Sequence, residues 1–130
     1  MAPELIGTDD YGKAVDWWAC GALLYEMLTS RPPFYSEDKR ETQMRICSPQ
    51  QVSLPRDRFG EDEAELLSGQ RGLLDKDPSQ RLIGHDVQHA RWFAQIDWDK
   101  LLARGYRAPV TPPIDHELDL QNFERGASFY

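Results

Sequence analysis

Few residues of this 130-residue chain have the types and spacing that chemistry requires. His85 and His89 stand four residues apart, a spacing that can place two metal ligands on one helix face, but no third ligand accompanies them. Cys20 and Cys47 form neither a C-x-x-C pair nor any other metal-binding spacing. Thr111 precedes a proline, so it is a candidate for proline-directed phosphorylation. From these residues alone we predict no metal site and no catalytic centre.

The stretch from Val15 to Leu28 must organise the chain, because it is almost entirely apolar. Its apolar residues surround the helix axis, which predicts a central helix buried on all sides. Cys20 lies within it and is expected to be a reduced, buried thiol. Two prolines follow at positions 32 and 33, so the helix should end near Thr29 or Ser30. A helix wrapped on every side also implies a larger body than a chain of this length easily supplies.

A second helix is expected after that proline pair. Ser36 is a candidate for its N-cap, with acidic residues in the first turn that favour the helix dipole. Met44 and Ile46 are the expected buried contacts, and the loop that follows has two apolar anchors, Leu54 and Phe59. These features predict a short helix that packs beside the central one.

A third helix is predicted from Glu61 to Leu74, but it carries a defect. Two glycines lie in its interior, between positions 68 and 72, and each costs about 1 kcal/mol relative to alanine. We therefore expect a break or a bulge there. Another short helix is expected from Asp99 to Ala103, and the chain beyond Tyr106 is proline-rich and extended. With no convincing strand, the fold class is predicted to be mainly α.

The composition limits the classes of function. The formal net charge is −7, which disfavours non-specific binding to nucleic acid or to anionic membranes. The N-terminus has no basic and then apolar run, so no signal peptide is expected, and no stretch is long enough to predict a transmembrane segment. A chain with few cysteines and no leader is expected in a reducing compartment, and we predict a cytoplasmic location.

Ordered motifs along nearly the whole chain resemble the protein kinase family. Together they are similar to the C-terminal part of the kinase C-lobe and the C-terminal tail of AGC-group serine/threonine kinases. The adjacent tryptophans, of which Trp18 is the second, are typical of that group. The motifs are Ala2-Pro3-Glu4, Asp16-Trp17-Trp18-Ala19-x-Gly21, Arg31-Pro32-Pro33-Phe34, Asp77-Pro78-x-x-Arg81-Leu82, His89-x-x-Trp92-Phe93 and the tail segments Pro109 to Pro113 and Asn122-Phe123-Glu124.

This resemblance implies a domain organisation and an activity. Residues 1–93 would be a partial protein kinase domain that starts at the Ala-Pro-Glu motif, and residues 94–130 an AGC C-terminal extension. The parent protein would transfer the γ-phosphate of ATP to serine or threonine of protein substrates, with ATP and Mg²⁺ as cofactors. Its partners would be protein substrates or another kinase, with no nucleic acid.

The resemblance also shows which kinase motifs the sequence does not contain. It has no G-x-G-x-x-G, no His-Arg-Asp and no Asp-Phe-Gly, the motifs that hold ATP, metal and the catalytic carboxylate in kinases. We therefore expect this chain alone to be inactive and to hold no cofactor. A truncated gene model, a splice product or a degenerate copy would each have this sequence. The alternative function is a non-catalytic interaction module or decoy, which would bind through the apolar surface left by the missing half.

Several residues take roles from the resemblance. Glu4 and Arg81 are expected to form an ion pair that ties the activation segment to the lobe. Asp16 would accept hydrogen bonds from the catalytic loop of a full kinase, and in this chain it is expected only to cap its helix. Glu26 is a candidate for binding a substrate arginine, with a solvated surface acid as the plainer alternative. Phe123 matches the tail aromatic near adenine, although an apolar anchor in a loose tail is the simpler interpretation.

Three further features concern the comparison with the family. Leu23 and Met27 match central-helix residues that support apolar side chains beneath adenine, and we expect plain core packing for both. Gln70 to Gly72 looks like an insertion of about three residues in a Leu-Leu-x-x-Leu-Leu helix, which would rotate the helix face by roughly 300° unless it bulges out. Glu124 replaces the usual aspartate of the tail motif.

Overall fold

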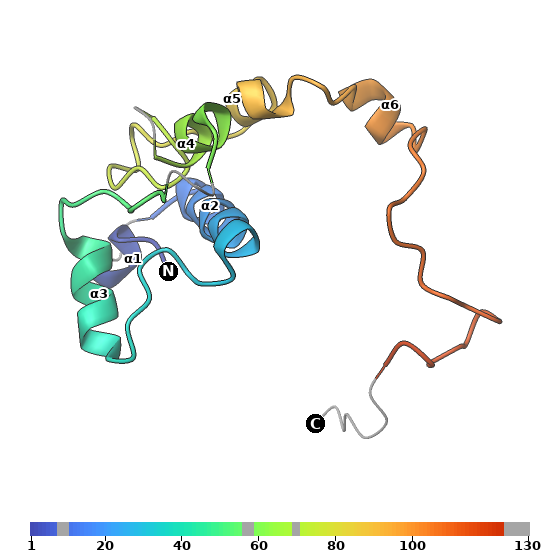
Figure 1. Cartoon of the computed structure of the whole chain (residues 1–130), viewed down its shortest axis with the longest axis horizontal. Coiled ribbons are helices and arrows are strands. Elements are labelled where there is room, and N and C mark those ends of the chain that lie inside the picture. Colours follow the sequence, from blue (N-terminus) through green and yellow to red (C-terminus); the bar gives the residue numbers. More distant parts are fainter. Residues whose placement is uncertain (8–10, 56–58, 69–70, 124–130) are drawn as a thin grey trace. The chain divides into compact units, whose positions relative to one another are not determined.

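The computed structural model describes residues 1–7, 11–55, 59–68 and 71–123, and it divides into two compact units. The first unit comprises Met1–Gln95 and the second Ile96–Tyr130. Every regular element among the described residues is a helix, which confirms the mainly α fold class (Figure 1). The elements are α1 (Glu4–Gly7), α2 (Ala14–Thr29), α3 (Lys39–Cys47), α4 (Glu61–Ser68), α5 (His85–Gln88), the 3-10 helix η1 (Arg91–Phe93) and α6 (Trp98–Leu102).

Helix α2 supplies the centre of the first unit through one face. Trp18, Gly21 and Tyr25 are its buried residues, spaced so that they follow one another along a single side of the helix. Gly21 allows the closest approach, since a Cβ added there would lie 2.7 Å from the Cβ of Leu73. The helix ends as predicted, because Ser30 adopts a left-handed conformation (φ 61°) and its N–H donates to the carbonyl of Glu26.

The opposite face of α2 corrects the prediction of burial on all sides. Leu23 and Met27 are 60% and 73% exposed, and Cys20 is an exposed free thiol, not a buried one. The predictions of core packing for these three residues are therefore wrong in this structure. Apolar residues show that a face can be buried, but burial also needs side chains to cover it, and the described residues leave this face open.

Helix α3 begins two residues later than the sequence suggests. Its N-cap is Asp38, whose Oδ1 accepts from the backbone N–H of Arg40 at 2.8 Å, so the prediction of a Ser36 cap is wrong. An aspartate next to the helix provides the same acceptor with a full charge, which suits the positive end of the helix dipole. Ile46 is buried as expected, whereas Met44 is 64% exposed and the prediction of its burial is wrong.

Helix α4 ends at Ser68, which confirms the predicted break. The backbone N–H groups of Leu73 and Leu74 donate to the carbonyls of Leu66 and Leu67 at 2.8 and 2.9 Å, and all four leucines are buried. Leu73 and Leu74 are thus hydrogen-bonded to the last turns of α4. Gln70, within the apparent insertion, lies outside the described residues, as does Glu124 in the tail.

Buried aromatic and aliphatic residues join these helices into one main core. Tyr25 of α2 stacks on Phe59 with ring centroids 5.6 Å apart, and its hydroxyl donates to the carbonyl of Ser53 at 3.0 Å. The anchoring role expected of Phe59 is therefore present, while Leu54 is only partly buried against the core. Val52, which the sequence analysis did not single out, is 7% exposed. These contacts fix the long segment between α3 and α4 onto α2.

The second unit contains α6 and an extended segment. Asp97 caps α6 by accepting from the N–H of Lys100 at 3.0 Å, and the Lys100 ammonium lies 4.6 Å from the ring centre of Tyr106. Large apolar residues beyond it are exposed, among them Val110 at 79% and Leu118 at 84%. Among the described residues, no helix of either unit has the length and apolar character needed to cross a membrane.

Candidate functional site

The most specific polar arrangement in the first unit is the pair between Glu4 and Arg81. Two hydrogen bonds join the side chains: Arg81 Nη1 donates to Glu4 Oε1 at 2.6 Å, and Arg81 Nη2 donates to Glu4 Oε2 at 3.0 Å. The side chain of Glu4 is 9% exposed and that of Arg81 is 0% exposed. A guanidinium and a carboxylate matched in this fork geometry form a strong and directional contact. The structure thus brings together two residues that are 77 positions apart in the sequence.

The remaining donors of Arg81 tie two further segments to the pair. Nε donates to the carbonyl of Asp75 at 2.9 Å, and Nη1 also donates to the carbonyl of Ala14 at 2.9 Å. The guanidinium carbon lies 5.0 Å from the ring centre of Trp18. One side chain therefore holds α1, the first turn of α2 and the turn before position 81 in a single arrangement.

Local sequence explains why the two partners reach this place. The side chain of Asp77 accepts from the N–H of Ser79 at 2.9 Å, and its carbonyl accepts from the N–H of Arg81 at 3.0 Å, which closes a tight turn. At the other end, Ala2 is 1% exposed and its carbonyl accepts from the N–H of Leu5 at 3.1 Å, which starts α1. The turn and the helix therefore set the directions of both side chains.

Lys76 adds a second cation to the surroundings of Trp18. The indole of Trp18 stacks on Phe34, with ring centroids 5.5 Å apart and planes 9° apart. The Lys76 ammonium lies 4.3 Å from the ring centre of Phe34 and donates to the carbonyls of Arg45 and Ile46 at 2.8 and 2.6 Å. Those carbonyls belong to the last turn of α3, where a cation is favourable. Lys76 thus fastens the end of α3 to the aromatic stack.

Sequence reasoning did not find Lys76. The residue stands between two aspartates in a polar turn, where a lysine usually projects into water. The available signal was indirect: the last turn of the predicted second helix needs donors or a cation for its free carbonyls. Only the fold places this ammonium there.

The pKa values of two of these groups reflect their surroundings. Burial by itself would raise the pKa of the Glu4 carboxyl, but the hydrogen bonds and charge of Arg81 outweigh it and leave that pKa below its ordinary value. Burial lowers the pKa of the Lys76 ammonium. The Glu4–Arg81 pair is therefore an ionised one near neutral pH, with the carboxylate stabilised by its partner.

The other residues singled out from the sequence lie away from this pair. Asp16 is exposed in the first turn of α2, and the N-cap position belongs to Lys13, which makes no side-chain capping bond. The expectation that Asp16 caps the helix is thus wrong. Glu26 is exposed on the same helix, and Phe123, 64% exposed, belongs to the second unit. Their roles in binding stay predictions.

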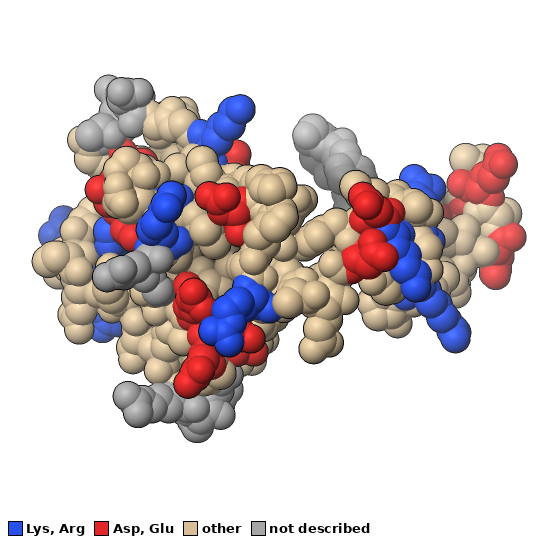
Figure 2. Space-filling view, turned by 90° about the horizontal axis from the view of Figure 1, so that it is seen from above, with Lys and Arg blue, Asp and Glu red and all other residues tan. Residues whose placement is uncertain are grey.

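The described residues include no cluster of side chains arranged to bind a metal ion. No group of three or more His, Cys, Asp or Glu among them is arranged to hold a metal. The imidazoles of His85 and His89 lie 3.9 Å apart, but Nδ1 of His89 is already 2.9 Å from the carbonyl of His85. On the face shown in Figure 2, acidic and basic side chains of the described residues are interspersed.

Comparison with known proteins decides the family. The model of the protein kinase domain matches residues 1–93, which contain both halves of the Glu4–Arg81 pair. The chain belongs to the protein kinase domain family. Its similarity to AGC-type serine/threonine kinases covers nearly its whole length, so it corresponds to part of such a kinase.

Three relatives illustrate that similarity. The chain is 40% identical over 127 residues to the serine/threonine-protein kinase YPK1 of Saccharomyces cerevisiae, a match that covers 95% of the chain and 18% of YPK1. It is 39% identical over 135 residues to the kinase sgk-1 of Caenorhabditis elegans, covering 96% of the chain and 27% of sgk-1. It is 36% identical over 129 residues to the RAC-beta serine/threonine-protein kinase of Rattus norvegicus, a match that covers 95% of the chain and 26% of that kinase. The kinase chain therefore spans about a fifth to a quarter of the length of these relatives.

Proposed function

We propose that this chain is the part of an AGC-type serine/threonine kinase that fixes the end of the activation segment to the lower lobe. In this proposal the whole kinase transfers the γ-phosphate of ATP to serine or threonine of proteins, with Mg²⁺. The observation that supports it most directly is the Glu4–Arg81 pair, because a fully buried guanidinium joins the two family motifs with the geometry of a fixed anchor. The work of this chain is thus positioning.

The chain alone is proposed to be inactive. Phosphoryl transfer depends on positioned phosphates, metal ions and a catalytic carboxylate, and the motifs that supply them do not occur in this sequence. No described group of acidic residues offers a metal site in their place. We therefore assign ATP and Mg²⁺ to the whole kinase and derive no catalytic step from these residues. A cytoplasmic location is part of the same proposal.

Glu26 is our candidate for recognition of a basic substrate. Its carboxylate is exposed on α2, so an arginine of a substrate peptide can reach it from solvent. An exposed carboxylate–guanidinium contact is worth about 0.2–1 kcal/mol, which corresponds to as much as fivefold in affinity. Glu26 would therefore adjust the preference for a peptide without being essential to the reaction.

A chimera tests the function. The segment of YPK1 that precedes its region of similarity is fused to the N-terminus of this chain, and transfer of labelled phosphate from ATP to a serine peptide with upstream arginines is measured with Mg²⁺. We expect transfer by the chimera and none by the chain alone. In the chimera, Glu26→Gln should raise KM for the arginine peptide up to about fivefold and leave KM for an alanine-substituted peptide unchanged.

The outcomes separate the alternatives. Transfer by the purified chain alone would contradict its inactivity. A chimera that melts cooperatively but transfers no phosphate would contradict the kinase proposal and favour the non-catalytic module, whose support is the exposed apolar face of α2. An equal change in KM for both peptides would remove the role given to Glu26.

A further inference from the structure

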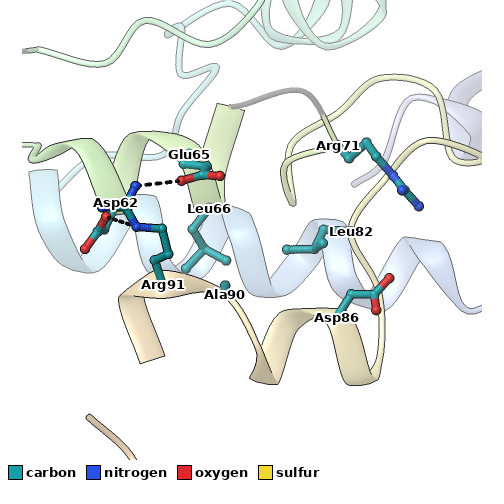
Figure 3. A pocket seen from close by; sticks show the side chains of 8 residues that line it. All are labelled: Asp62, Glu65, Leu66, Arg71, Leu82, Asp86, Ala90 and Arg91. Carbon is teal, nitrogen blue, oxygen red and sulfur yellow. Dashed lines mark ion pairs between the residues drawn. The ribbon is translucent and has the colours of Figure 1, made fainter. Parts of the chain in front are cut away.

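A cleft lies between α4 and the segment formed by α5 and η1, and neither Glu4 nor Arg81 lines it (Figure 3). Its volume is about 360 Å³, within the range of about 300–1,000 Å³ that is common for ligand sites. Both walls belong to the first unit. The cleft is lined by Asp62, Glu65, Leu66, Arg71, Leu82, Asp86, Ala90 and Arg91.

The floor of the cleft is apolar. Leu66 is 2% exposed, and Leu82 and Ala90 are partly buried against the same cluster. Figure 3 shows these three side chains in the middle of the cleft, with charged side chains on either side of them. An apolar strip between charged ends suits a side chain that is itself apolar and belongs to a chain with polar groups on both sides of it.

One end of the cleft already holds a guanidinium. Arg91 Nε lies 3.3 Å from Asp62 Oδ1, and Nη1 lies 3.9 Å from Glu65 Oε2. The side chains of Arg91, Asp62 and Glu65 are 70%, 40% and 64% exposed, so this is a loose contact in water. Exposed pairs of this kind contribute little to stability, and another guanidinium can take the place of Arg91.

The other end of the cleft is charged differently. Asp86 at the start of α5 and Arg71 within the apparent insertion line it together, and Figure 3 places both side chains at that end. Neither makes an ion pair with another described residue. Arg71 offsets Asp86, so the cationic group of a ligand is favoured at the Asp62 and Glu65 end. The lining as a whole has three carboxylates against two guanidiniums.

We propose that this cleft binds a short peptide segment of a protein partner, with an apolar side chain on the Leu66–Leu82–Ala90 floor and an arginine at Asp62 and Glu65 in place of Arg91. The charge of the chain favours a basic partner, since the net charge is −7. The contact of Arg91 is a template for the second half of the interaction, because it already places a guanidinium against those carboxylates. The proposal does not depend on the kinase activity of the whole protein.

The test uses the full 130-residue chain and a labelled peptide. The probe is acetyl-Gly-Leu-Gly-Arg-Gly-amide with a fluorescent tag, and binding is followed by fluorescence anisotropy at low salt. Two control peptides replace the leucine by serine or the arginine by glutamate. We expect the serine peptide to bind at least tenfold more weakly, because burial of a leucine side chain is lost. The glutamate peptide should bind at least fivefold more weakly, because the arginine contact is lost and its charge repels Asp62 and Glu65.

Two matched variants distinguish the two ends of the cleft. Glu65→Gln and Asp86→Asn each remove one negative charge, but only Glu65 belongs to the proposed arginine site. We expect Glu65→Gln to weaken binding about two- to fivefold and Asp86→Asn to change it less than twofold. Arg91→Gln should tighten binding by a similar two- to fivefold, because the peptide no longer competes with an internal guanidinium.

Several results would overturn the proposal. These are no binding of the probe at millimolar concentration, equal binding of the serine peptide, or equal weakening by Glu65→Gln and Asp86→Asn. Ala90→Phe, which fills the floor, should abolish binding, and retention of binding by this variant would also reject the site. If Ala90→Phe melts earlier than the parent chain, amide chemical shifts of the unaltered chain replace it. Shifts confined to α4, α5 and η1 support the cleft, and shifts elsewhere reject it.

Discussion

Replacement of Arg81 by alanine is the most direct perturbation of the anchor. The change removes the guanidinium half of the pair from a site where the Glu4 side chain is 9% exposed. It also removes the donors to the carbonyls of Asp75 and Ala14 and the cation above Trp18. Loss of one partner of a buried ion pair costs about 3–5 kcal/mol. We therefore expect a loss of about 4 kcal/mol in the free energy of unfolding.

That loss is large for a chain of this size. Domains are stable by about 5–15 kcal/mol, so the variant should retain only a small margin. Equilibrium unfolding in urea, followed by far-UV circular dichroism, measures it. With a slope of about 2 kcal/mol per molar urea, the midpoint should fall by about 2 M. The control is Arg91→Ala, which breaks only exposed contacts and should lower the free energy by less than about 1 kcal/mol.

A second variant separates the cost of breaking the pair from one side from the net value of the pair. In Glu4→Leu/Arg81→Met both charges are replaced by apolar side chains, so no buried charge stays without a partner. We expect this double variant to be clearly more stable than Arg81→Ala. If the Arg81→Ala midpoint matched that of Arg91→Ala, the interpretation of the pair as an anchor would be refuted.

Three further predictions follow from the same contacts. Because the pKa of the Glu4 carboxyl is lowered in the folded chain, the carboxylate stabilises the fold fully above its unfolded pKa, near 4.5, and this effect is lost as pH falls below that value. Wild type and Glu4→Gln should therefore converge in the free energy of unfolding at low pH, and a constant difference between them would contradict this. Lys76→Met should speed amide hydrogen exchange in α3 at least fivefold, because two carbonyls there lose a cationic donor; unchanged exchange would refute the fastening role. Gly21→Ala should destabilise by about 1–3 kcal/mol, because its Cβ would lie 2.7 Å from that of Leu73, whereas Gly12→Ala meets nothing within 4 Å and serves as the control in thermal unfolding.

Several helices and some of their ends were predictable from the sequence, although α1 was not predicted. The end of α2 depends on chain chemistry that is local, two prolines and a residue that accepts a positive φ, and the prediction is confirmed within a residue. The break after α4 is likewise a local effect, because two glycines separate its leucine pairs. The predicted N-cap of α3 was wrong by two residues, because Ser36 and Asp38 are both favourable N-cap residues and only the path of the chain decides between them.

The faces that are exposed could not be predicted in the same way. Leu23 and Met27 have the composition of core residues, and their exposure depends on which other segments are present. The Glu4–Arg81 pair was found through two family motifs, since no local pattern links residues so far apart. Lys76 had no such motif, and its place above Phe34 depends on the packing of three separate segments.

The span of the anchor also has a consequence for synthesis. Arg81 leaves the ribosome 77 residues after Glu4, and at about 5–20 residues per second this interval is about 4–15 s. During that time the Arg81 guanidinium is not yet available to the carboxylate of Glu4 or to the ring of Trp18. The contact is also far from local, which slows folding because a long loop must close before the contact forms. The first unit is therefore expected to fold late, after the turn that carries Arg81 has emerged, with α1 among the last elements to pack.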